Sequence, residues 1–320
     1  MIPSSSTRGA PGKVILFGEH SVAYRQPAIA TPIDRTLTLT VTLGGNRPTG
    51  PAVDPSLRAA IDTAAQFFSL APDRITTSIE SRIPAGYGLG SSAALSVALA
   101  RTLADLSGTE LGRVDLLAQA TAIESAFHGA SSGLDVAAVA LGTTTWFHRV
   151  PSPHATLLPI GTAFDLVVAV TRHQRSTAEQ IQRVRRRAQS RPDALSREFA
   201  RLGALTRAGR HALFTGDLCA LGRFMDEAHT LLAGIGVSTP ALELAVTTAR
   251  TAGALGAKLT GAGGGGAIIA LAPGNAPAVA AALRAAGCEP FISRVAAARP
   301  SGAKQGAGQA DRVYSVHLEE

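Results

Sequence analysis

Apolar and polar residues alternate most strictly at residues 36–43, where the run TLTLTVTL places every second side chain on one face. This period of two predicts a β-strand with one buried face. Short apolar runs bounded by turn residues predict further strands at 13–17, 75–83, 143–149, 164–171, 257–259, 267–271 and 291–294. Strands are therefore expected in both halves of the chain.

The stretches between these runs show apolar residues every three to four positions, which is the period of an amphipathic helix. The predicted helices cover 56–70, 93–106, 112–127, 134–141, 177–187, 193–213, 218–232, 240–252 and 276–286. Ser238 or Thr239 is the expected cap of the helix that begins at Pro240. Strand-rich and helix-rich stretches follow one another, which indicates an α+β protein with a boundary near residue 165.

The composition sets the kind of core and excludes several classes of protein. Of the 320 residues, 46% are hydrophobic and only 4% aromatic, so an aliphatic core is expected. No apolar run approaches the ~20 uncharged residues of a membrane helix. The first residues, MIPSSSTRGAPGK, lack the apolar core of a secretory signal, so we expect a cytoplasmic protein without membrane contact. Cys219 and Cys288 fit no metal-ligand pattern, which disfavours a disulfide framework or a zinc site.

The net charge of +7 comes from a single segment. Residues 172–211 contain eleven arginines and three acids, a balance of +8, so the rest of the chain sums to about −1. This pattern is typical of the solvated face of one or two helices, and a funnel for anionic ligands is the sharper alternative. Nucleic-acid binding is not expected, because the segment lacks interleaved aromatic residues that could stack on bases.

The segment IPAGYGLGSSAALSVALA, residues 83–100, joins a predicted strand to an apolar helix. Its three glycines let the backbone approach an anion closely, and its two serines stand at a helix start, where unpaired N–H groups favour negative charge. Residues 88–93 also fit the loose dinucleotide pattern G-x-G-x-x-A, but the second strand of that fold does not follow. The chain has no G-x-x-x-x-G-K-[ST] loop. Phosphate binding and a structural turn both remain open at this point.

A second glycine cluster, GAGGGG at residues 261–266, lies between two apolar strands. Four consecutive glycines are costly to order, and a tight turn needs only one or two of them. Close approach of this backbone, either to a ligand or to the other loop, explains the cluster better than a turn does.

Charged residues occur at two further places. APGKVILFGEHSV places Lys13, Glu19 and His20 around a short apolar strand, and IESAFHGASSGLDVAA holds Glu124 and Asp135. Taken alone, residues such as Lys13, Glu19 and His20 are more often surface or core polar residues, and Asp135 could be a plain helix cap. Together with the glycine loops they supply what phosphoryl transfer needs: a phosphate cradle, oxygen ligands for Mg²⁺, a cation and an acid that orients a hydroxyl.

Three stretches resemble the motifs of the GHMP small-molecule kinases, in order and at both ends of the chain. They are residues 10–22 with the following PAIATPID, residues 84–94, and residues 258–266, and the resemblance extends over roughly residues 8–295. Within this superfamily the chain is most similar to the mevalonate kinase family. The stretches that carry this similarity are GKVILFGEHSVAY, ESAFHGASSGLD, RSTAEQIQRVR and GIGVSTPALELAVTTARTAGALGAKLTGAGGGG.

The resemblance implies a two-domain α+β fold with the active site in the cleft between the domains. An N-terminal domain at 1–164, like ribosomal protein S5 domain 2, would precede a ferredoxin-like domain at 165–299 and a flexible tail at 300–320. The resemblance further implies ATP and Mg²⁺ as cofactors. A small-molecule substrate such as mevalonate is implied, and a homodimer is left open.

The resemblance also assigns roles to individual residues. Asp135 and Lys13 match the catalytic pair, and Ser92 and Glu124 match the ligands of Mg²⁺. Substrate contact or ordering of the site falls to Glu19, His20 and Thr177. The residues expected to bind ATP are Pro84, Ala85, Gly86, Tyr87, Gly88, Leu89, Gly90, Ser91, Ser92, Gly261 and Gly263.

The chain departs from the usual family pattern at three positions. Ser131 stands where proline is more common, Arg25 where a glycine often follows the tyrosine, and Tyr87 where a small residue is usual. The leading interpretation is phosphorylation of the primary hydroxyl of mevalonate by ATP. The alternatives are a phosphomevalonate kinase, a GHMP kinase for a sugar or homoserine, and a non-catalytic sensor on the same fold. A dinucleotide-dependent oxidoreductase would leave the other two motifs unexplained.

Overall fold

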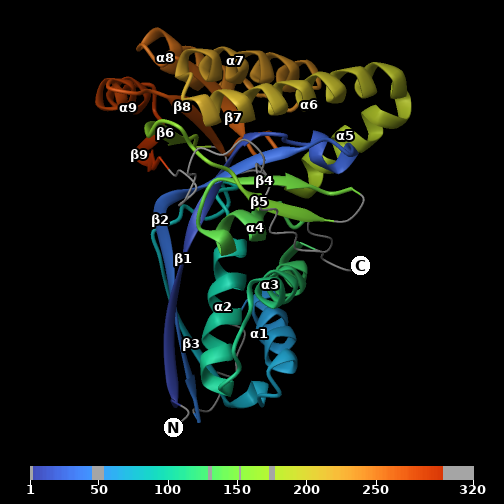
Figure 1. The fold of residues 1–320 in the computed structure, drawn as a ribbon, viewed down its shortest axis with the longest axis vertical. Helices are drawn as coiled ribbons and strands as arrows, with labels where there is room; N and C mark the ends of the chain where they lie inside the picture. Colours follow the sequence, from blue (N-terminus) through green and yellow to red (C-terminus); the bar gives the residue numbers. More distant parts are fainter. Residues whose placement is uncertain (1–2, 45–53, 129–131, 151–152, 173–176, 298–320) are drawn as a thin grey trace, which may run out of the picture.

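The computed structural model describes residues 3–44, 54–128, 132–150, 153–172 and 177–297 of the chain. Two antiparallel sheets lie one above the other in Figure 1, each covered by its own helices.

The first sheet is built around one long strand, β2 (Ala28–Leu43). It pairs along its length with β1 (Ser5–Phe17), and it also pairs with β3 (Ile75–Ser81) at one end and with β4 (Thr145–His148) at the other. The edge strand β5 (His154–Leu157) adds to β4. Because β2 is long enough to pair with three strands, it joins β1, β3 and β4 into one sheet although they are distant in the sequence.

Helix α2 (Ser91–Ser107) forms the centre of the first half. It packs on β1 and β2 and is covered by α3 (Arg113–His128) and α4 (Leu134–Leu141), with α1 (Pro55–Phe67) outside α3. Two short 3₁₀ helices complete this half: η1 (Ser21–Tyr24) joins β1 to β2, and η2 (Pro72–Arg74) joins α1 to β3. Helix α2 is buried on nearly every side, which explains why its sequence is alanine- and leucine-rich all round.

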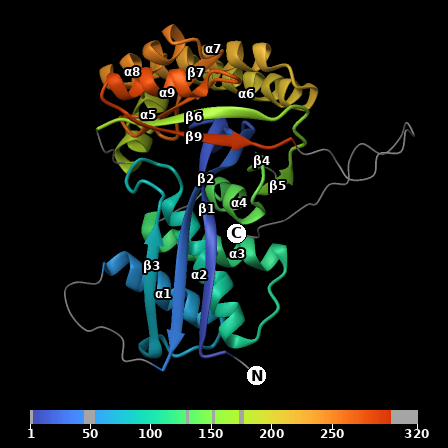
Figure 2. The same ribbon diagram turned by 90° about the vertical axis from the view of Figure 1, so that its left-hand side faces the viewer.

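The second sheet contains four strands in the order β7-β8-β6-β9. They are β6 (Phe164–Val170), β7 (Gly256–Thr260), β8 (Ala267–Leu271) and β9 (Glu289–Val295). Between β6 and β7 come α5 (Thr177–Ser190), α6 (Pro192–Thr215), α7 (Leu218–Gly234) and α8 (Pro240–Thr251), and α9 (Ala276–Ala285) joins β8 to β9. This split β-α-β arrangement is ferredoxin-like, as predicted. Figure 2 shows α7, α8 and α9 above the sheet.

The predicted elements are found, with differences at their ends. Strands β1 and β2 each begin eight residues before the predicted start. Residues 5–11 of β1 pair with residues 36–42 of β2, and residues 29–33 of β2 pair with residues 12–17 of β1, so pairing extends both strands beyond the predicted runs. Strand β5 was missed, since its sequence, HATL, carries little apolar signal. Thr239 caps α8 by accepting a hydrogen bond from the Leu242 amide. The expected tail at 300–320 lies outside the described residues, and the domain limits stay a prediction.

Hydrogen bonds connect the first sheet to the second near the end of β1. The amide of Ile15 donates to the hydroxyl of Thr260 on β7 at 2.9 Å, and that hydroxyl donates to the carbonyl of Ile15. The Asp34 amide similarly donates to Ser293 on β9. These contacts hold the end of β1 against β7, which is where the charged residues singled out from the sequence lie.

Candidate active site

Lys13 and Asp135 form an ion pair at the centre of the site. The ammonium of Lys13 lies 2.9 Å from Oδ2 of Asp135, and the lysine is buried while a third of the aspartate side chain is exposed. Asp135 is the second residue of α4, and the N-cap position belongs to Gly133. The interpretation of Asp135 as a plain helix cap is therefore wrong. Its carboxylate is instead presented to solvent beside a buried cation.

The loop before α2 wraps around the same lysine. The Lys13 amide donates to the carbonyl of Leu89 at 2.8 Å, and its ammonium donates to the carbonyl of Gly88 at 3.2 Å. Gly90 is the N-cap of α2 at φ 81°, and a Cβ there would lie 2.8 Å from Cγ of Lys13. Only glycine allows this approach, so the loop and the lysine are fixed relative to each other.

The first turn of α2 offers a set of anion-binding groups. Helix α2 starts at Ser91, and no side chain caps its N-terminus. Backbone N–H groups at such a helix start bind phosphate well. Tyr87, in the same loop, is half-buried and packs against the core. The packing of its ring accounts for the size of this side chain without a ligand, and its place in the loop expected to bind ATP stays a prediction.

Ser92 and Glu124 lie together at the inner end of this loop. The hydroxyl of Ser92 is 3.4 Å from Oε1 of Glu124, and Glu124 is only 3% exposed. Two oxygen donors of this kind suit Mg²⁺, which is usually held by one or two carboxylates together with substrate phosphates and water. Among the described residues no cluster of three or more His, Cys, Asp or Glu side chains could hold a metal alone. The residues therefore fit a magnesium ion that is shared with a nucleotide.

Glu19 is placed differently from a substrate-contacting residue. Its carboxylate is fully buried and accepts a hydrogen bond from the ammonium of Lys258 on β7, which is also fully buried. Burial raises the pKa of Glu19 and lowers the pKa of Lys258, and in both cases the partner's charge opposes the shift. Because the Glu19 side chain presents no surface to the cleft, its geometry favours ordering of the site over contact with a substrate.

His20 links the end of β1 to the second glycine cluster. Its Nε2 lies 2.9 Å from the carbonyl of Ala262, and its backbone has the left-handed φ of 57°. Within residues 261–266 every glycine has a positive φ. The Gly264 amide donates to the carbonyl of Val237 at 2.7 Å. The cluster thus approaches the backbone of the connection between α7 and α8 closely, a partner that the sequence did not predict.

Thr177 is the exposed first residue of α5. One turn later, Gln180 packs against Gly264, so the start of α5 lies beside the glycine turn. The arginines of α5 and α6 are mostly exposed, which supports the interpretation of a solvated helix face. Some of them have partners: Arg187 donates to the carbonyl of Gly234, Arg201 pairs with Glu227, and Arg210 lies over the ring of Trp146.

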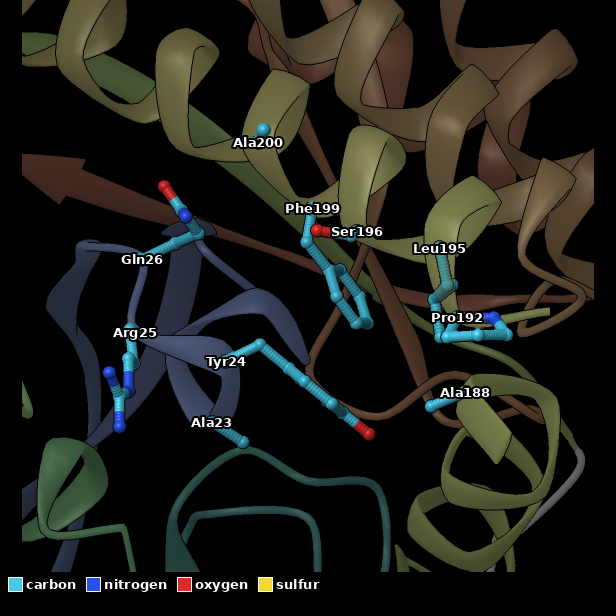
Figure 3. Close-up of a pocket in the computed structure, with 10 residues that line it drawn as sticks. All are labelled: Ala23, Tyr24, Arg25, Gln26, Ala188, Pro192, Leu195, Ser196, Phe199 and Ala200. Carbon is cyan, nitrogen blue, oxygen red and sulfur yellow. The ribbon is translucent and has the colours of Figure 1, made fainter. Parts of the chain in front are cut away.

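A pocket of about 440 Å³ opens between η1 and the helices α5 and α6. Figure 3 shows the rings of Tyr24 and Phe199 side by side in it, and their centroids are 4.3 Å apart. Arg25 lines the pocket and has a left-handed φ of 64°. This backbone explains why glycine is common at that position in the family. None of the site residues predicted from the sequence lines this pocket.

Comparisons with known proteins agree with this geometry. Residues 57–143 match the family model for the GHMP kinases N terminal domain, and residues 210–287 match the one for GHMP kinases C terminal. The chain is 35% identical to the mevalonate kinase of Thermococcus onnurineus over 89% of its own length and 95% of that protein. It is 36% identical to the mevalonate kinase of Pyrococcus horikoshii, with 89% and 94% covered.

The chain belongs to the mevalonate kinase family of GHMP kinases. A solved structure of L. major mevalonate kinase in complex with R-mevalonate superposes with a TM-score of 0.84 at 28% identity, covering 93% of this chain and 98% of that one. The two-domain α+β fold and the ATP-dependent kinase activity expected from the resemblance are thereby confirmed. No helix in the described part of the chain is long and apolar enough to cross a membrane.

Sequence reasoning overlooked two residues that the structure brings into the site of this mevalonate kinase family member. Lys258 and Thr260 both lie on β7 and both contact the end of β1. Their signal was present in the sequence, because the run AKLTGAGGGG places a lysine inside an apolar strand. A lysine at such a position is almost never fully buried unless it is paired.

Proposed function

We propose that this enzyme transfers the γ-phosphate of ATP to the primary hydroxyl of mevalonate, giving 5-phosphomevalonate and ADP. The observation that carries the proposal is the ion pair between Lys13 and Asp135, which lies beside the N-terminus of α2. An acid that faces solvent, a buried cation and a phosphate-binding helix start are the parts that phosphoryl transfer to an alcohol requires. Membership of the mevalonate kinase family supports mevalonate as that alcohol.

Asp135 orients the attacking hydroxyl and takes its proton. The hydroxyl oxygen forms a bond to the γ-phosphorus while the bond from that phosphorus to the bridging oxygen of ADP breaks. Such general-base assistance contributes typically about 10²–10⁴-fold to the rate. Lys13 neutralises part of the charge that develops during transfer, from a buried position where this effect is larger than in water.

The nucleotide phosphates are held by the loop at residues 84–92 and the first turn of α2. Gly261 and Gly263 close the cleft beside them. Ser92 and Glu124 would hold Mg²⁺, which when bound neutralises phosphate charge. His20 and Thr177 lie where they can border the acceptor, since His20 is hydrogen-bonded to the glycine turn and Thr177 starts the helix that packs on it.

A coupled assay of ADP release tests the proposal. The purified chain is supplied with ATP, Mg²⁺ and, in separate reactions, mevalonate, phosphomevalonate, homoserine and galactose. We expect turnover with mevalonate and a product phosphorylated on the primary hydroxyl. Turnover with phosphomevalonate alone would replace the proposed substrate. Binding without turnover on all four would point to a sensor.

Three further expectations from the sequence stay predictions. They are a cytoplasmic location, the absence of nucleic-acid binding, and a homodimer as an open alternative to a monomer. Size-exclusion chromatography with light scattering decides the last of these directly.

A further inference from the structure

The face of β7 that carries Lys258 and Thr260 is hydrogen-bonded to the end of β1 and the residues that follow it. Alternate residues of a strand share one face, so these two side chains point the same way. Thr260 exchanges two hydrogen bonds with the backbone of Ile15, and Lys258 donates to the carboxylate of Glu19. Just beyond β7, the carbonyl of Ala262 receives His20. The second sheet thus fixes the segment that begins with catalytic Lys13.

Four charges alternate in sign across this region. Asp135 faces the ammonium of Lys13, and the positive charge of Lys13 acts on the Glu19 carboxylate and lowers its pKa. Glu19 in turn is paired with Lys258. The series of charges therefore extends from the partly exposed carboxylate of Asp135 to a lysine fully enclosed in the second sheet. Because Lys13 and Glu19 both belong to the same short segment, a shift of one displaces the other.

Burying the pair of Glu19 and Lys258 costs the fold desolvation free energy. Lys258 and Glu19 lose all contact with water, and burial disfavours the charged form of each. One carboxylate oxygen of Glu19, Oε2, has no hydrogen-bond partner among the described residues. A buried ion pair of this kind is weak evidence for stability, because apolar residues of the same volume often stabilise a core as well or better. Its place beside Lys13 suggests a functional reason.

We infer that Lys258 is a positioning residue for phosphoryl transfer: through Glu19 it sets the place and the electrostatic field of Lys13 opposite Asp135. Lys258 itself does not reach the substrate, because its side chain is fully enclosed. The inference rests on the proposed function for its reaction and adds Lys258 to the residues that this reaction uses. It predicts that removal of the pair impairs turnover even in a chain that folds well.

The test uses three variants of the full chain and one matched control. Lys258→Met leaves the Glu19 carboxylate buried without its partner, and we expect it to be poorly folded. Glu19→Gln/Lys258→Met removes both charges with little change in volume and should fold. Glu19→Gln alone keeps an oxygen acceptor for Lys258 but removes its counter-charge, so its kinetics are read only if its melting temperature shows that it folds. The control is Arg250→Met, which breaks an ion pair to Asp226 and a hydrogen bond to Ala257, immediately before Lys258 on the same strand.

For the folded variants we measure the melting temperature, kcat and KM for ATP and mevalonate. We expect the double variant and Glu19→Gln to lose about tenfold or more in kcat, with KM for ATP within about threefold of the wild type, because an interaction of the transition state is weakened. Arg250→Met should lower the melting temperature and leave kcat within about twofold.

A double variant that melts normally and turns over like the wild type would overturn the inference, and the pair would then be structural only. An equal loss of kcat in Arg250→Met would also overturn it, because any loosening of β7 would then suffice. The ratio of variant to wild-type kcat is taken on the acceptor that the wild-type chain phosphorylates. If that acceptor is not mevalonate, the proposed function fails while this ratio still tests Lys258.

Discussion

The ammonium of Lys13 on β1 lies 2.9 Å from the carboxylate of Asp135 on α4, although the two residues stand far apart in the chain. The same lysine is tied by its backbone and its side chain to the loop before α2. One buried cation thus contacts both the group that would meet the acceptor hydroxyl and the loop that would meet the nucleotide. Substitutions around this lysine separate the two tasks.

Asp135→Asn should lower kcat by about 10²-fold or more, because the amide cannot accept the proton of the attacking hydroxyl. Nucleotide binding should remain nearly intact, since the loop at residues 84–92 keeps its contacts. Steady-state kinetics and nucleotide titration by calorimetry measure the two effects. Wild-type turnover in this variant would remove Asp135 from the mechanism.

Gly90→Ala should displace Lys13, because the added Cβ would lie 2.8 Å from Cγ of that lysine. We expect kcat to fall by about tenfold or more, since small misplacements of catalytic groups have large effects. The control is Gly142→Ala, which has a comparable positive φ and nothing within 4 Å of the new Cβ. Both variants should lose about 1–2 kcal/mol of stability from backbone strain. Only Gly90→Ala should lose activity, and a similar kcat in the two would contradict the steric explanation.

Arg25→Gly should stabilise the protein. Arg25 has a left-handed φ of 64°, which costs about 1–2 kcal/mol for a residue with a side chain, and glycine avoids this strain at a smaller cost in unfolded-state entropy. We expect a net gain of up to about 1 kcal/mol in the free energy of unfolding, measured by urea denaturation. A loss of stability would mean that contacts of the guanidinium outweigh the strain. KM for mevalonate, measured in parallel, reports whether this pocket residue affects the substrate.

His229 should make stability depend on pH. Burial lowers its pKa below the ordinary value of 6.5, and its Nδ1 accepts a hydrogen bond from the amide of Leu259 on β7. The nearby charges of Glu243, Arg250 and Lys258 also act on it, the first raising and the other two lowering its pKa. Because the unfolded state binds the proton more readily, the free energy of unfolding falls as pH drops below about 6.5.

His229→Gln provides the comparison for this pH effect. The variant lacks the titrating ring, so its free energy of unfolding should fall less steeply between pH 7.5 and 5.5, by at most about 1.4 kcal/mol per pH unit. His148, whose pKa burial also lowers, is present in both proteins and cancels from the difference. Parallel slopes in the two proteins would show that His229 does not carry the effect.

Much of the fold could be predicted from local pattern. The alternation at residues 36–43 identified β2, and the apolar period of three to four identified every helix of the second half. The first halves of β1 and β2 were not predicted. Residues 5–11 of β1 are mostly exposed and are held by pairing with residues 36–42, and residues 29–33 of β2 pair with residues 12–17. Pairing of this kind depends on a partner that local sequence does not reveal.

The candidate site also has features that local sequence predicts and features that depend on tertiary contacts. The sequence by itself determined the glycine-rich loop before α2, the glycine turn and the residue types around them, because glycine conformation and helix starts are local properties. Only the tertiary structure decided that Asp135 faces Lys13 instead of capping α4, and that Glu19 is enclosed with Lys258 instead of facing the cleft. The reason is physical: ion pairs and burial depend on distances between groups from separate segments, and those distances exist only once the two sheets have packed together.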